Sequence, residues 1–348
     1  MTGGAAWVAE GSIGWRILLS ATLPTPPDIA ALTAALTRLY DDQHWPVRDV
    51  LVGPSSERLR HELVAADPHP LLVGVAADEV VVSAHHSAVD GLGLLEVLSR
   101  CELPGVRGEI RSSAHGIGDR PPAHGLAVGI ASRLAEAALR PPARPAPSER
   151  VTPSAPGDAL VDTSVAGRRR TAEIVHAAAT AISAWQRAGG GSGGHLAVAV
   201  GASRIVRAPG APLADDSALL RLRDVERMTR DEVAAAVRSA PPEPSPHGTG
   251  TATGTLLALG MRLLRTRLGS SLLVSHLGEV SAPGVEQLVF HPVTAGGSGL
   301  SLGAVGHAGR TTLTLRARAA RWDRDGLERL LEAIVDRLPD GHRRAGNR

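Results

Sequence analysis

The most specific pattern in the chain is VVVSAHHSAVDG, residues 80–91. Its first part is rich in β-branched residues and predicts a strand, and residues 91–100 carry apolar residues at the spacing of an amphipathic helix. Two adjacent histidines, His85 and His86, therefore stand where a strand ends, and Asp90 and Gly91 stand where a helix begins. Rigid scaffolds commonly present catalytic groups on loops that follow buried strands. This stretch is the first candidate for an active site.

The residue types in this loop suit proton transfer. Histidine is the side chain whose ordinary pKa lets it take up and return a proton near neutral pH. Adjacent residues of an extended segment point to opposite faces, so one of His85 and His86 can line a cleft while the other packs inward. We expect Asp90 to hold the turn through an ion pair or backbone bonds, and Gly91 to allow a close backbone approach or a positive φ. The alternative is a pair of histidines with purely structural roles at a turn.

Outside this motif, the sequence predicts both strands and helices in each half of the chain. In the first half, strands are predicted at residues 15–23, 71–75 and 79–84, and helices at 29–40 and 91–100. In the second half, strands are predicted at residues 196–200, 272–275, 299–305 and 311–317, and helices at 171–187, 230–238, 256–268 and 326–338. Strands and helices do not alternate strictly, which predicts an α+β fold of two lobes, or two open-faced α/β sandwiches.

A stretch rich in Pro, Gly, Arg and Ser separates these two halves. It runs over residues 103–157 and is interrupted by one helical patch at 126–139. Proline removes backbone donors and blocks helix formation, so the run RPPARPAP from Arg140 is expected to be extended or irregular. We therefore predict an N-terminal lobe at 1–140 that carries the histidine pair, a Pro-rich linker at 141–157 and a C-terminal lobe at 158–348.

Composition excludes several classes of function. The 348 residues include 37 basic residues, all of them Arg, so the Lys of a P-loop and the Lys of a Schiff-base enzyme are both absent. The net charge is only +2 and aromatic residues make up 2%, which does not match a nucleic-acid-binding surface. No apolar run approaches the ~20 residues of a membrane span. A single cysteine, Cys101, excludes an internal disulfide framework, and no secretory signal is visible, so we expect a cytoplasmic protein.

Three other motifs are weaker candidates for functional sites. Residues 299–303 match the G-x-S-x-G nucleophile elbow, but that motif needs a strand before the serine and a helix after it, and here a second strand follows. The Gly-rich loop at 189–194 precedes a strand and has no Lys, so we interpret it as a connector. The run of arginines at 168–170 is typical of a solvated face. His176, His195 and His307 show no metal-ligand spacing with one another, so no metal site is predicted.

Residues 85–91 resemble the HHxxxDG signature of the chloramphenicol-acetyltransferase-like superfamily. This group includes nonribosomal peptide condensation domains, polyketide-associated acyltransferases, wax ester synthases and plant acyltransferases. The strand ending in Arg204 resembles a strand of the second lobe in this superfamily. The pair Ser275-His276 resembles its Ser-Asn segment, with His276 where Asn is usual, and residues 300–338 resemble its final strand–turn–strand–helix.

The resemblance implies two lobes in a V with a tunnel between them. It implies that His86 is the catalytic base and that His85 and Gly91 support its loop. Asp90 would be structural and paired with an arginine on the first strand, where Arg16 is the candidate. The second lobe would supply a wall of the site, with Ser275, His276 and Arg204 as candidates.

The function implied is that of a condensation-type acyltransferase. Such an enzyme moves an acyl group from a thioester of CoA or of a carrier protein's phosphopantetheine to an amine or hydroxyl of a small-molecule acceptor, in natural-product or lipid biosynthesis. It holds no permanently bound cofactor. Two alternatives stay open: a catalytically degenerate module that binds carrier proteins, and an epimerase-like member that moves an α-proton.

Overall fold

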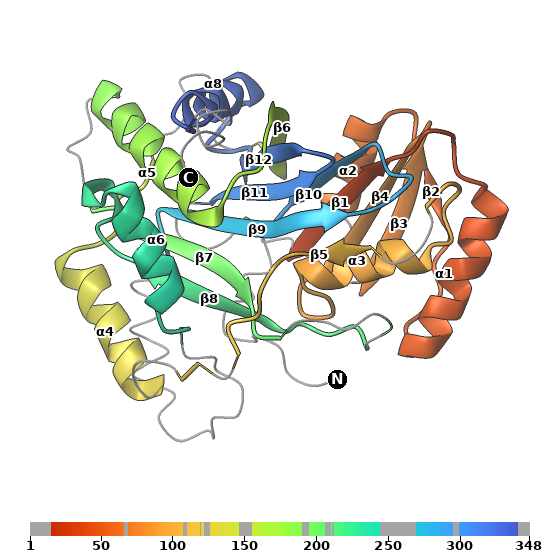
Figure 1. Ribbon diagram of the computed structural model, residues 1–348, viewed down its shortest axis with the longest axis horizontal. Helices are drawn as coiled ribbons and strands as arrows, with labels where there is room; N and C mark the ends of the chain where they lie inside the picture. The colour runs from red at the N-terminus through yellow and green to blue at the C-terminus, as the bar shows by residue number, and fades with distance from the viewer. Residues whose placement is uncertain are drawn as a thin grey trace, which may run out of the picture.

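The computed structural model describes residues 15–65, 69–106, 110–118, 120–121, 126–145, 155–189, 195–205, 210, 212–243, 269–294 and 299–339. These residues form a mixed α/β protein with two lobes in a V arrangement, each built on one β-sheet (Figure 1). Among the described residues, no helix combines the length and the apolar character needed to cross a bilayer.

The first sheet has the strand order β10-β1-β4-β3-β2. Its strands are β1 (Arg16–Thr22), β2 (Leu51–Val52), β3 (Leu71–Ala76), β4 (Glu79–His85) and β10 (Gln287–His291). Its helices are α1 (Ile29–Gln43), α2 (Ser56–Ala65) and α3 (Gly91–Arg100). Helices α1 and α3 share one apolar core with the sheet, whereas α2 packs in a separate cluster against the residues of the other face. The histidine pair thus ends a central strand.

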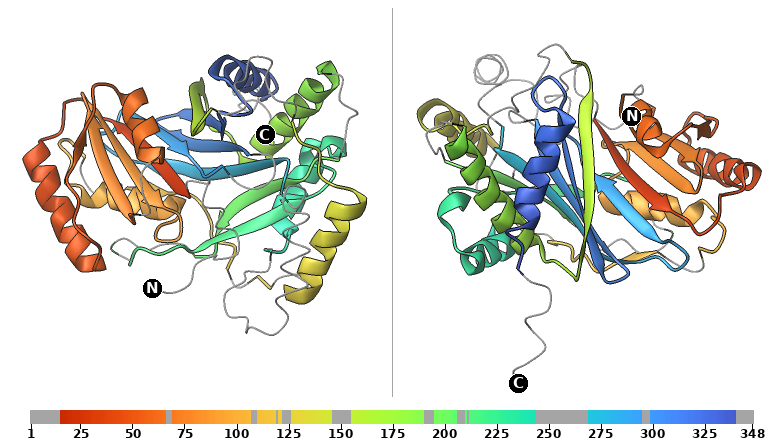
Figure 2. Two further views of the ribbon diagram at one scale, coloured as in Figure 1. Left: turned by 180° about the vertical axis from the view of Figure 1, so that it is seen from behind. Right: turned by 90° about the horizontal axis from the view of Figure 1, so that it is seen from above.

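The second sheet has the strand order β6-β12-β11-β9-β7-β8, and the short strand β5 also pairs with β9. Its strands are β5 (Arg111–Ser112), β6 (Asp158–Ala166), β7 (Val198–Ser203), β8 (Ser217–Leu222), β9 (Leu272–Ser281), β11 (Leu300–His307) and β12 (Arg310–Arg318). The helices of this lobe are α4 (Leu126–Leu139), α5 (Thr171–Ala188), α6 (Arg230–Ser239) and α8 (Arg324–Val335). Helices α5, α6 and α8 share one core with the sheet, and Figure 2 shows them on one side of it.

The two lobes exchange strands. Strand β10 comes from the C-terminal half but lies antiparallel to β1 in the first sheet, with Leu18 opposite His291. Strand β5 comes from the N-terminal half and pairs with β9 of the second sheet. The buried Arg316 of β12 donates to the carbonyl of Arg16 at 2.6 Å, which ties the sheets together. The lobes are therefore interleaved, and the domain boundaries at 140 and 158 stay a prediction.

Most of the predicted elements have counterparts in the structure. The predicted helix at 126–139 coincides with α4, and the predicted strand at 79–84 and helix at 91–100 are β4 and α3. The predicted helix at 256–268 lies outside the described residues. The sequence did not predict β2, α2, β5, β6, β8, β10 or the short 3-10 helix at Val225–Arg227.

Candidate active site

The histidine pair lies at the end of β4, and the two rings have different partners. His85 is paired with Arg16 across the β1–β4 ladder, and its Nδ1 lies 2.7 Å from the Ser87 hydroxyl. Burial, followed by the neighbouring charges of Arg16 and His86, lowers the pKa of His85. The lowered pKa favours the neutral form of His85, and its ring is bonded within its own loop.

His86 faces the other lobe. Its backbone N–H donates to the Trp15 carbonyl at 2.7 Å, which fixes the start of the turn against β1. Its side chain is 23% exposed, and its Nδ1 lies 3.6 Å from Oδ1 of Asp215. Asp215 precedes β8 in the second lobe. The partly open His86 ring thus stands at the junction of the two lobes.

Asp90 connects the helix after the motif to the second lobe. It is the N-cap of α3, where its Oδ1 accepts the Gly93 N–H at 2.7 Å. Its Oδ2 accepts the Asp216 N–H at 3.2 Å, and its own N–H donates to the Ala214 carbonyl at 3.3 Å. Asp90 therefore satisfies a helix end and holds the segment of the second lobe that carries Asp215.

Arg16 is fully buried below the motif. Its guanidinium donates to the Ser83 hydroxyl at 2.8 Å, to the Ser83 carbonyl at 2.6 Å and to the His69 carbonyl at 2.6 Å. These bonds fix the end of β4 from beneath. The predicted ion pair between Arg16 and Asp90 stays a prediction, which the double-mutant cycle in the Discussion tests.

Gly91 lies close to Leu277 of the second sheet and to Phe290 of the first. A Cβ atom at Gly91 would lie 2.7 Å from Cδ2 of Leu277 in β9 and 3.3 Å from Cζ of Phe290 in β10. Such distances are shorter than ordinary van der Waals contact, so a methyl group here would require the Leu277 side chain to shift. Of the two expected reasons for this glycine, the close approach is the one that the geometry supports.

We expect Gly91→Ala to lower the free energy of unfolding by about 1–3 kcal/mol, the usual cost of overpacking. Urea unfolding measures this cost. The added Leu277→Val change removes the clashing Cδ2, so the double variant should lose less than the sum of the single losses. A stable Gly91→Ala protein would contradict the role of this contact.

The two residues that the sequence predicts to form a wall of the site, Ser275 and His276, lie on opposite faces of β9. Leu273 belongs to the core cluster shared with the first lobe, and Ser275 follows on the same face because side chains alternate along a strand. His276 points the other way, with its Nδ1 3.1 Å from the Thr171 hydroxyl at the start of α5. The sequence predicts one wall from Ser275 and His276. The pleat of β9 separates the two side chains, and it is Ser275 that lies on the face toward the first lobe.

Burial lowers the pKa of His276 to about 4. In the unfolded chain the pKa of this histidine is about 6.5. Between pH 6.5 and pH 4 the unfolded state therefore binds more protons than the folded state, and the free energy of unfolding falls as the pH falls. We expect the free energy of unfolding to drop by up to about 1.4 kcal/mol per pH unit in this window. His276→Gln should flatten that slope in urea titrations. An equally steep slope in the variant would contradict the prediction.

Arg204 follows the last residue of β7. Its backbone N–H donates to the Asp216 carbonyl at 2.8 Å, so it continues the β7–β8 ladder toward the histidine loop. This bond places Arg204 across from the segment that contains Asp215. Sequence reasoning selected Arg204 but not Asp215, because nothing in the spacing of a remote Asp-Asp pair identifies a partner for His86.

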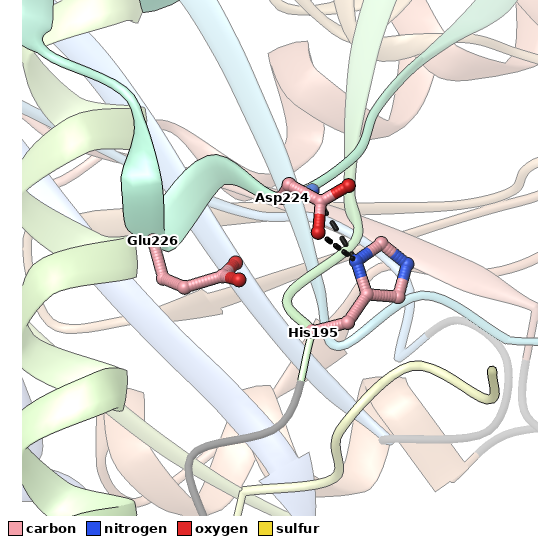
Figure 3. A group of neighbouring side chains, drawn as sticks. All are labelled: His195, Asp224 and Glu226. Atoms are coloured by element: carbon pink, nitrogen blue, oxygen red, sulfur yellow. Dashed lines mark hydrogen bonds and ion pairs between the residues drawn. The ribbon is translucent and has the colours of Figure 1, made fainter.

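Within the part of the chain that the structure describes, one group of side chains is close enough to hold a metal ion. Figure 3 shows His195, Asp224 and Glu226, whose ligand atoms all lie within 4.8 Å of one another. The atoms already have partners: His195 Nδ1 lies 3.2 Å from Asp224, His195 Nε2 lies 3.1 Å from Glu136, and Glu226 accepts the Leu196 N–H at 2.8 Å.

Arginines complete this network. Arg221 donates to Glu136 at 2.8 Å, and Arg140 pairs with Asp224 at 2.5 Å. The contacts to Arg221 and His195 outweigh the opposing effect of burial, and they lower the pKa of Glu136 to about 2. A cation would have to displace guanidinium groups that already neutralise these carboxylates. We interpret the cluster as a network that attaches α4 to the second sheet.

The alternative catalytic motif does not present a nucleophile. Ser301, the central serine of the G-x-S-x-G match, lies within β11 and is fully buried. Its hydroxyl lies 3.4 Å from the Arg316 carbonyl. A nucleophile elbow needs an exposed hydroxyl on a sharp turn, so the hydrolase reading of this motif fails. In the arginine run, Arg168 lies 3.3 Å from Glu279 and is largely exposed.

The fold is similar to solved condensation domains. No protein-family model and no curated protein matches the chain. The starter condensation domain of rhizomide synthetase RzmA, in complex with C8-CoA, is 14% identical with a TM-score of 0.58, and the match covers 95% of this chain and 90% of that one. The first condensation domain of the calcium-dependent antibiotic synthetase is 12% identical with a TM-score of 0.58, and the match covers 94% and 92%.

An epimerization domain has the same architecture. The domain from the third module of tyrocidine synthetase B is 10% identical with a TM-score of 0.50, and the match covers 94% of this chain and 90% of that one. Identities this low establish the fold alone. In its two-lobed α/β architecture, the chain is similar to condensation-type domains of peptide and polyketide synthetases.

Proposed function

We propose that this protein is a condensation-type acyltransferase in which His86 is the general base. The observation that carries the proposal is the position of His86 at the lobe junction, with a partly exposed ring and its Nδ1 facing Asp215 of the second lobe. This orientation leaves Nε2 as the nitrogen available to an acceptor. The fold similarity to condensation domains supports the same reading.

The proposed reaction transfers an acyl group from sulfur to nitrogen or oxygen. His86 Nε2 takes the proton of an acceptor N–H or O–H, and the acceptor atom attacks the thioester carbonyl carbon. The new C–N or C–O bond forms, the C–S bond breaks, and the thiolate sulfur takes the proton back from the imidazolium. The balance is one thioester and one acceptor consumed, and one amide or ester and one thiol produced.

The donor in this proposal is a thioester of CoA or of a carrier protein. One neighbouring structure is in complex with C8-CoA, and another holds C8-CoA together with Leu-SNAC. For this chain we propose the same donor class and a small-molecule amine or alcohol as acceptor. The protein itself supplies the base and the lobe junction.

The assay uses the purified full chain with a panel of acyl-CoA and acyl-carrier-protein donors. Mixed amines and alcohols serve as acceptors, and release of free thiol reports the transfer. We expect thiol release that depends on both donor and acceptor and is lost in the His86→Ala protein. Absence of transfer across the panel, in a protein that still binds a carrier protein, would favour the degenerate binding module.

The fold similarity to an epimerization domain supports one further candidate activity. An epimerase-like protein would use the His86 region to remove and return an α-proton without forming a new bond. In heavy water it would introduce deuterium at the α-carbon of a carrier-bound aminoacyl group. An acyltransferase would release thiol without introducing deuterium. One experiment in heavy water that measures both thiol release and deuterium uptake therefore distinguishes the two activities.

A further inference from the structure

The segment that carries Asp215 is attached to the first lobe by several hydrogen bonds besides the contact to His86. Besides the two bonds to Asp90, the Gly210 N–H donates to Oε1 of Glu96 in α3 at 3.1 Å. Glu96 is itself paired with Arg100 at 2.7 Å one turn later. The described parts of the β7–β8 connection therefore run along α3, as Figure 1 shows below that helix. This attachment makes the segment part of the histidine site.

The carboxylate of Asp215 is oriented within this segment. Its Oδ1 accepts the Ser217 N–H at 3.1 Å and the Ser217 hydroxyl at 2.5 Å. The same oxygen lies 3.6 Å from His86 Nδ1, and the Asp215 side chain is 30% exposed. Two local bonds thus hold one carboxylate oxygen toward one nitrogen of His86.

From this geometry we propose that Asp215 is the positioning residue that selects the tautomer of His86. The inference rests on the proposed function and extends it. A neutral imidazole carries one N–H, and a carboxylate oxygen beside Nδ1 favours the tautomer that has the proton there. The lone pair of Nε2 then points away from Asp215 and can take the proton of the acceptor. A separation of 3.6 Å is a loose contact, typical of catalytic contacts that shorten when substrate binds.

Each of the neighbouring polar and charged groups makes hydrogen bonds to other parts of the protein. His85 Nδ1 is engaged by Ser87, and Arg16 is bonded to Ser83 and the His69 carbonyl. Both oxygens of Asp90 accept backbone N–H groups. Among the described residues, Asp215 is the acidic side chain paired with the His86 ring.

The test measures the tautomer of His86 by long-range ¹H–¹⁵N NMR of the full chain, at a pH where the ring is neutral. The His86→Gln protein assigns the signals. We expect the Nδ1–H tautomer in the unaltered protein and a shift toward Nε2–H in Asp215→Ala. Asp215→Asn keeps an oxygen that can accept the Ser217 bonds but removes the negative charge. It therefore measures the effect of the charge on the tautomer even if the alanine variant does not fold. Asp42→Asn, on the exposed side of α1, is the matched loss of a distant carboxylate and should leave both tautomer and activity unchanged.

Kinetics provide the second readout. We expect Asp215→Ala to lower kcat by about 10- to 100-fold with little change in KM, a smaller loss than removal of the base. Asp215→Glu should restore part of kcat. A folded Asp215→Ala protein with an unaltered tautomer, or an unaltered protein in the Nε2–H form, would overturn the inference. Because the NMR signal needs no turnover, a failed acyl-transfer assay would contradict the proposed function without deciding the role of Asp215.

Discussion

Replacing His86 by alanine should lower turnover by about 10²- to 10⁴-fold, the usual contribution of a general base, while the fold stays intact. The side chain is 23% exposed and lies at the lobe junction beside Asp215, so its removal should leave the apolar cores intact. Thiol release under saturating donor and acceptor measures the rate, and urea unfolding measures the stability. Equal rates in the variant and the unaltered protein would show that His86 is not the base.

His85→Ala is the matched comparison. His85 is bonded to Ser87 and lies beside the buried Arg16, so its loss should reduce stability and disturb the turn more than the chemistry. We therefore expect a larger fall in the free energy of unfolding and a smaller fall in rate than for His86. The reverse ranking would mean that the two histidines exchange roles.

The elements around the motif could be predicted because local and tertiary preferences agree there. β4 is a run of valines that is buried along nearly its whole length, and α3 begins at an aspartate that caps it. Helix α5 is long and strongly periodic, and its predicted bounds of 171–187 differ from the observed ones by one residue. These segments needed no information from remote parts of the chain.

The missed strands depend on remote partners. β10 is five residues long and becomes a strand by pairing with β1, far away in the sequence. β6 directly follows the Pro-rich stretch and contains polar residues, and it forms as the partner of β12 at the edge of the sheet. Short strands of mixed composition carry little local signal, so their pairing decides their structure.

The candidate site divides in the same way. The histidines, Asp90 and Gly91 could be selected from one short motif. Asp215 could not, because its place beside His86 follows from bonds between the segment before β8 and α3. Ser275 and His276 were selected together, but the alternation of side chains along β9 sends them to opposite faces.

Asp90→Asn should reduce stability and activity together. Asparagine caps helices about as well as aspartate, so the bond to the Gly93 N–H can persist. If the Asn oxygen keeps the bond to Gly93, the Asn NH₂ group takes the place of the carboxylate oxygen that accepts the Asp216 N–H. Two donors would then face each other, and the Asp216 N–H would lose its acceptor. Leaving that donor unsatisfied costs about 1–3 kcal/mol, and Asp90→Ala should cost about 2–4 kcal/mol because the cap is lost as well.

The loss of activity in Asp90→Asn follows from the released segment, since Asp215 would no longer be held beside His86. Melting temperature and rate should therefore fall in step, whereas a normal melting temperature with no activity would indicate a direct catalytic role. A double-mutant cycle with Arg16→Met tests the predicted ion pair. If Arg16 and Asp90 form an ion pair, their losses should couple by about 0.5–3 kcal/mol. Losses that add within about 0.5 kcal/mol would show that Arg16 and Asp90 act independently and would contradict the pair.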